Sequence, residues 1–128
     1  MSTRPTETLA ESISFEDFWN WLSAHRHCIL RAGTGDVLIF DHDEYHWYMF
    51  IDKNGAHVVQ LVRGKLLVAE MVVLGGDIVY VFAQSNAHDE HVFDCMVETP
   101  GGTEIAYHFV LAHAFESEGS DEAPRLTH

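Results

Sequence analysis

The chain is poor in the residues and segments that several classes of protein require. Its 128 residues include only two cysteines, too few for a disulfide scaffold. Residues 1–12 lack the apolar run of a secretory signal. The longest apolar stretch, residues 66–76, is interrupted by Glu70 and falls short of the ~20 residues that span a bilayer. We therefore expect a cytoplasmic protein with reduced thiols and no membrane insertion.

Basic residues and catalytic motifs are also scarce. Seven lysines and arginines face 20 aspartates and glutamates, which gives a formal net charge of -13 and a pI near 4.9. Proteins that bind a phosphate backbone need the opposite sign, so nucleic acid is an unsuitable partner. The chain has neither a glycine-rich loop opening a helix nor a serine elbow. Cys28 and Cys95 are expected as small buried hydrophobes, and no catalytic residue is predicted.

One segment has a helical pattern, which predicts a helix over residues 15–24. Ser14 is a good N-cap residue, Asp17 stands at the capping-box position, and Ile13 can pack as a hydrophobic staple. The apolar side chains recur at i, i+3, i+4 and i+7, so the helix has one apolar face; they are Phe15, Phe18, Trp19 and Leu22.

From residue 28 onward the pattern changes to short apolar runs separated by turn signals. The predicted strands are 28–32, 37–41, 46–52, 57–63, 66–74, 78–84, 91–98 and 104–115. Their short connections favour antiparallel neighbours, because a parallel crossover needs a dozen or more residues. The prediction is a single α+β domain, residues 13–115, between a solvated tail of residues 1–12 and an acidic tail of residues 116–128. In it, the N-terminal amphipathic helix precedes a strongly curled antiparallel meander sheet of seven to eight strands.

Alternation along the strands predicts which side chains are buried. In the last run one face is expected to be core; its members are Ile105, Tyr107, Phe109, Leu111 and Phe115. The runs between residues 58 and 82 instead carry apolar residues on both faces, as strands covered twice do. One helix cannot cover so many strands, so either the sheet curls around its own core or a second copy packs on it.

Ten histidines are the compositional feature that points to chemistry. In an uninterrupted meander, seven of them gather at one end of the sheet together with several carboxylates; they are His25, His27, His42, His46, His88, His91 and His113. Imidazole and carboxylate groups are ligands of divalent transition metals. The predicted metal ligands are His42, His46, His88, His91 and His113. Two loops can share an ion only if the sheet curls, since four strand spacings measure roughly 19 Å.

Two functions follow from these patterns. The first is a small acidic protein-interaction domain without catalytic activity, adaptor-like or chaperone-like, which binds another protein or itself as a homodimer. Its size and acidity are similar to those of secretion chaperones and adaptor proteins, although the chain lacks the helices that such chaperones carry after their middle strands. The alternative is a divalent-metal-binding or pH-sensing protein, because protonation of ten histidines would take the net charge from -13 to about -3.

Overall fold

The computed structural model describes residues 10–86 and 88–115. The elements, in chain order, are β1 (Ala10–Ile13), α1 (Phe15–Ala24), η1 (Arg26–Cys28), β2 (Ile29–Gly33), β3 (Leu38–Phe40), β4 (His46–Ile51), β5 (His57–Arg63), β6 (Leu66–Val73), η2 (Gly75–Asp77), β7 (Ile78–Ser85), β8 (His91–Thr99) and β9 (Gly102–Leu111). The helix has the predicted bounds, and the backbone N–H of Asp17 donates to Ser14 Oγ at 3.1 Å as the capping pattern requires. None of the helices among these residues is long and apolar enough to cross a membrane.

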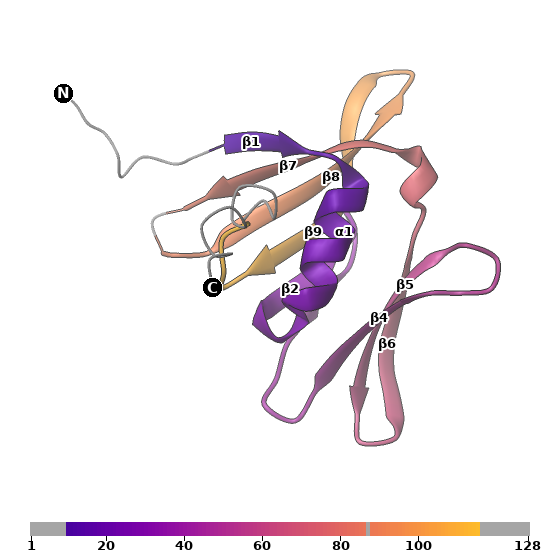
Figure 1. The fold of residues 1–128 in the computed structure, drawn as a ribbon, viewed down its shortest axis with the longest axis vertical. Coiled ribbons are helices and arrows are strands. Elements are labelled where there is room, and N and C mark those ends of the chain that lie inside the picture. Colours follow the sequence, from indigo (N-terminus) through magenta and orange to yellow (C-terminus); the bar gives the residue numbers. More distant parts are fainter. Residues whose placement is uncertain (1–9, 87, 116–128) are drawn as a thin grey trace, which may run out of the picture.

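The strands form two antiparallel sheets (Figure 1). Six strands make the larger sheet in the order β1-β7-β8-β9-β2-β3, and β4-β5-β6 make the smaller one. In the larger sheet, β2 pairs with β9 and β1 pairs with β7, so segments from both ends of the chain lie side by side. The predicted tail 1–12 therefore overlaps β1, which begins at Ala10. The predicted tail 116–128 lies outside the described residues.

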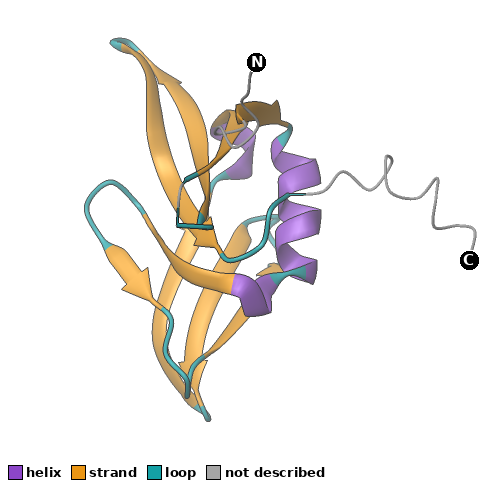
Figure 2. Cartoon of the chain, turned by 90° about the vertical axis from the view of Figure 1, so that its left-hand side faces the viewer, coloured by secondary structure: helices purple, strands orange, loops and turns teal. Residues whose placement is uncertain are grey.

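The helix packs on one face of the six-stranded sheet, and the strands form the other layer (Figure 2). The Phe18 ring stacks on Phe93 with centroids 5.1 Å apart and meets Phe109 edge-on at 5.6 Å. All three side chains are at most 1% exposed. Such aromatic pairs contribute about 1 kcal/mol each beyond the area they bury. This contact is the centre of the core.

The prediction of one strongly curled meander is wrong in its details. Neither sheet is strongly curled, and the described residues form nine strands in two sheets. The connection 41–45 leads the chain out of the larger sheet, and η2 leads it back, so consecutive strands stop pairing at both points. Short connections established the antiparallel directions correctly. Partner choice was decided instead by contacts between residues that are distant in the sequence.

The predicted core face of the last strand is half right. Phe109 and Leu111 are fully buried, but Ile105 is 48% exposed. The β8–β9 ladder has a β-bulge here, because Cys95 pairs with Tyr107 and the next residue, Met96, pairs with Ile105. The bulge interrupts the alternation, so Ile105 lies on the opposite face of the sheet from Phe109.

Gly33 is a position where an added methyl group should destabilise the fold. A Cβ at residue 33 would lie 1.9 Å from the Val37 carbonyl oxygen, whereas a Cβ at residue 35 of the same hairpin meets no atom within 4 Å. We expect Gly33→Ala to lower the free energy of unfolding by about 3 kcal/mol, since backbone must move. Gly35→Ala should change it by less than about 0.5 kcal/mol. Urea unfolding measures both, and equal effects would contradict this account of the hairpin.

Candidate interaction surface

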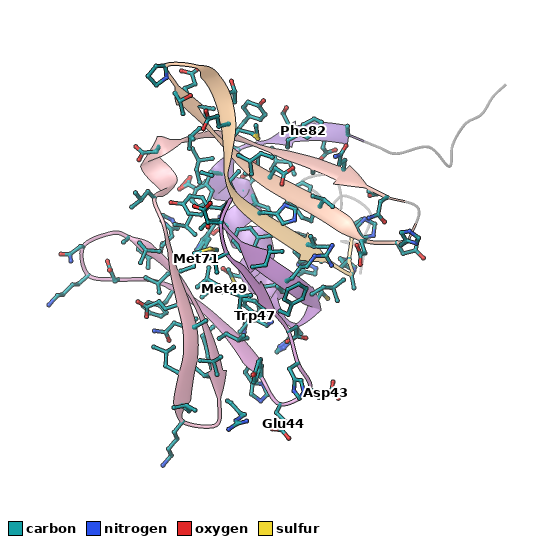
Figure 3. The ribbon with its side chains drawn as sticks, turned by 180° about the vertical axis from the view of Figure 1, so that it is seen from behind. Asp43, Glu44, Trp47, Met49, Met71 and Phe82 are labelled. Carbon is teal, nitrogen blue, oxygen red and sulfur yellow. The ribbon has the colours of Figure 1, made fainter. Side chains whose placement is uncertain are left out.

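The small sheet buries one face and leaves the other uncovered. Its inner face joins the core through Trp47, Val59, Leu61, Met71 and Val73, all at most 6% exposed. Figure 3 shows Trp47, Met49 and Met71 in a row where this sheet meets the rest of the molecule. The inner face is therefore buried in its middle, whereas Ile51 and Leu66 at its ends are 54% and 58% exposed.

Two further contacts hold the small sheet in place. The His57 ring meets Trp19 edge-on at 4.8 Å and Phe15 at 5.0 Å, which ties β5 to the helix. The indole Nε1 of Trp47 donates to Asp41 Oδ1 at 3.0 Å, which ties β4 to the preceding loop. The orientation of the small sheet relative to the helix is set by these side chains, because the two sheets share no strand pairing.

We call the opposite side of the small sheet the outer face. The strand register arranges it in three cross-strand rows, Phe50–Val58–Val72, Tyr48–Gln60–Glu70 and His46–Val62–Leu67. Two rows are mainly apolar, and the central row is polar, with Gln60 Nε2 donating to Glu70 Oε1 at 2.8 Å. On the central strand of this face Val58 is 5% exposed and Val62 is half-buried, whereas the flanking strands are open to solvent. Their large apolar side chains stay exposed at 48% for Tyr48, 41% for Phe50, 49% for Leu67 and 44% for Val72.

Sequence reasoning detected the two-sided apolar strands but did not identify the outer face. The signal was present as apolar residues at consecutive positions in 58–73. What the sequence lacked was the division into two sheets, which determines that one apolar side faces the helix and the other faces solvent. An apolar sheet face left in solvent is a candidate site for interaction with another molecule.

The charge of the protein is distributed unevenly between its parts. Residues 46–73 contain Lys53, Arg63 and Lys65 against Asp52 and Glu70, a formal net charge of +1. The other described residues carry 13 carboxylates and two arginines, a net charge of -11. The outer face therefore belongs to the least acidic part of the molecule, where an approaching surface meets the least electrostatic repulsion.

Most of the predicted histidine cluster lies at one end of the six-stranded sheet. His91 begins β8 opposite Leu111 at the end of β9, and Leu111 pairs in turn with Ile29 at the start of β2. The Asp41 N–H donates to the Leu30 carbonyl, which brings the end of β3 and the adjoining His42 to the same end. His46 is separate, because it opens β4 in the other sheet.

Sharing an end does not bring the predicted metal ligands together. β8 and β3 are three strand spacings apart in the sheet, roughly 14 Å. His91 Nδ1 lies 2.7 Å from Ser85 Oγ, and His42 Nδ1 accepts the Glu44 backbone N–H at 3.2 Å. His88 is exposed in the turn between β7 and β8. Across the described residues, no three His, Cys, Asp or Glu side chains are close enough to hold a metal ion, so the metal site stays a prediction from sequence alone.

The structure brings together a different pair of histidines. The rings of His25 and His113 stack with centroids 4.7 Å apart, and His25 also stacks on Trp21 at 4.5 Å. His25 Nδ1 lies 2.8 Å from the Trp21 carbonyl oxygen. His25 was predicted at the correct end of the sheet but not as a member of the site. Elsewhere, His108 Nδ1 lies 2.7 Å from Asp94 Oδ1 on adjacent strands.

Cys95 is not a nucleophilic centre, whereas a small cavity of about 80 Å³ is lined by Ser85 and His91, whose Oγ and Nδ1 atoms lie 2.7 Å apart. Cys95 is fully buried, and burial with Asp94 beside it raises the pKa of its thiol far above the ordinary range. A groove of about 480 Å³ lies along β7, β8 and β9 and is lined by Asp77, Val79, Val97, Glu98, Ala106 and Tyr107. No serine, cysteine or histidine lines it, so it holds no paired nucleophile and base.

Comparison with models of protein families, with curated proteins and with solved structures gives no match for this chain. The assignment of function therefore rests on the surface described above.

The Arg31–Glu90 pair near the histidine-rich end should be detectable by titration. Arg31 Nη2 donates to Glu90 Oε1 at 3.2 Å, and this bond, with one from Asn86, lowers the pKa of the Glu90 carboxyl. Its stabilising effect is present above the unfolded-state pKa and is lost as pH falls through the lower folded-state value. We expect Arg31→Gln to raise the Glu90 pKa toward its ordinary value near 4.5, measured by carboxyl NMR titration. Arg63→Gln is the control, and an unchanged Glu90 pKa in Arg31→Gln would contradict the assignment.

Proposed function

We propose that this protein is a non-catalytic interaction domain that docks on another protein molecule through its outer face. The observation that carries the proposal is the exposure of Tyr48, Phe50, Leu67 and Val72 on one side of a three-stranded sheet whose other side joins the core through Trp47, Val59, Leu61, Met71 and Val73. A soluble monomer gains nothing from leaving such side chains in water, whereas covering them releases about 25 cal/mol for each Å² of apolar area.

The arrangement of the outer face favours a specific contact over non-specific hydrophobic association. The polar row lies between two apolar rows, and Gln60 and Glu70 satisfy each other within it. Polar groups placed among apolar side chains restrict which partners fit, because an unmatched partner would leave them buried and unpaired. The face therefore combines apolar area with a requirement for matching polar groups.

A photo-crosslinking experiment tests the docking role. A benzophenone amino acid replaces Leu67 on the outer face in one variant and Ile105 on the β8–β9 hairpin in another; these positions are 49% and 48% exposed. Irradiation of native cells should give discrete protein adducts from position 67 and none from position 105. An absence of adducts at position 67, or the same adducts at both positions, would overturn the proposal.

A second candidate function, pH sensing, is favoured by the stacked His25 and His113 rings. Imidazole groups in general take up protons between pH 8 and pH 5. Two protonated rings 4.7 Å apart would repel each other, which opposes the packing of the segment after β9 against the helix end.

The fluorescence of Trp21 offers a direct measurement of this switch, because its ring stacks on both histidines. Between pH 8 and pH 5 we expect a spectral shift in the wild type. His113→Phe keeps an aromatic ring at the position but cannot be protonated, so the shift should be smaller, with only the contribution of His25 remaining. A shift of equal size in His113→Phe would eliminate the pH-sensing candidate and leave the docking role unaffected.

A further inference from the structure

The identity of the partner, inferred here from the geometry of the outer face, rests on the docking role proposed above. We infer that two copies of this chain meet through their outer faces about a two-fold axis parallel to β5, which places the basic turn 63–65 of each copy against the acidic loop 41–44 of the other.

The row pattern matches itself under this symmetry. Rotation about an axis along β5 stacks β4 of one copy over β6 of the other and leaves each row at its own level. Phe50 then faces Val72, and Tyr48 faces Glu70, so apolar side chains meet apolar ones and a phenol meets a carboxylate. Facing sheets pack about 10 Å apart, a distance that these side chains span. Each contact occurs twice, as an isologous interface requires.

Charges at one end of the small sheet select this axis. His46 at the start of β4 pairs with Val62 near the end of β5, so the loop 41–44 and the turn 63–65 lie at the same end, the lower end in Figures 1 and 3. The loop carries Asp41, Asp43 and Glu44 on the β4 side, and the turn carries Arg63 and Lys65 on the β6 side. Stacking β4 over β6 brings each acidic loop over the partner's basic turn. An axis perpendicular to the strands would instead place the acidic loop against the turn 52–55, where Asp52 and Lys53 cancel.

The charged groups at this rim are available for such contacts. Among the described residues, Asp43, Glu44, Arg63 and Lys65 form no ion pair within the chain. Two copies that each carry a net charge of -13 would repel each other in most orientations. The repulsion is weakest when the small sheets face each other, because residues 46–73 carry a net charge of +1. A second copy also supplies the acidic surface that complements the basic turn.

The available area predicts a weak dimer. Strands of six to eight residues give a face about 20–26 Å long, and with its side chains the three-stranded sheet has a footprint of roughly 400 Å². A standard interface buries about 800 Å² on each partner. Even with the rim loops included, we expect dissociation constants in the micromolar range, and added salt should weaken the dimer by screening the rim pairs.

Sedimentation equilibrium of the full chain, from about 1 μM to about 500 μM, tests the inference. The mass should rise from 14.5 kDa toward twice that value. Leu67→Glu should weaken association at least tenfold, whereas Ile105→Glu, at matched exposure, should not. Circular dichroism melting confirms that each variant is folded.

Charge reversal tests the axis itself. Lys65→Glu places an acidic residue against each acidic loop, and Glu44→Lys places a basic residue against each basic turn, so each variant alone should associate about tenfold less. An equimolar mixture of the two variants should recover the wild-type dimer, because both rim contacts of the mixed pair are then oppositely charged. Failure of the mixture to recover would overturn the proposed axis.

The failures of the two proposals can be told apart. If the chain stays monomeric and the crosslinker at position 67 captures a different protein, the dimer is wrong and the docking role stands. If the chain stays monomeric and position 67 captures nothing, both are wrong.

Discussion

The contact of Phe18 with Phe93 and Phe109 is the interaction on which the rest of the structure depends. It holds α1 against the six-stranded sheet. The remaining apolar side chains of the helix then pack either on this sheet or toward the small sheet. Trp21 and Leu22 are buried with Phe18, whereas Phe15 and Trp19 reach His57 of the small sheet. A helix of ten residues, about 15 Å long, has no surface left for a third sheet face.

The uncovered outer face follows from this limit. Two sheets have four faces, and α1 together with the contact between the sheets covers only some of them. The small sheet has apolar residues on both sides, so one apolar side remains in solvent in the described chain. The proposed interaction role and the proposed dimer both derive from this single consequence of having one short helix.

Charge reinforces the same division. The carboxylates are concentrated on the larger sheet, its loops and the helix, and the small sheet carries most of the described basic side chains. Net charge of one sign keeps such a protein soluble. The nearly neutral small sheet is then the part of the surface where apolar contact with an acidic molecule is least opposed, and the basic turn 63–65 gives that contact a preferred direction.

Sequence by itself determined the local structure of this protein. The helix bounds, the N-cap at Ser14 and the eight predicted strands follow from side-chain periodicity and turn residues, which act over a few positions. Only the tertiary structure decided the strand β1, the division into two sheets, and the partners of β2 and β9. It also brought the rings of His25 and His113 together, whereas the predicted metal site of His42, His46, His88, His91 and His113 stays a prediction. These outcomes depend on which side chains distant in the sequence are buried together, and periodicity along a single strand does not encode that.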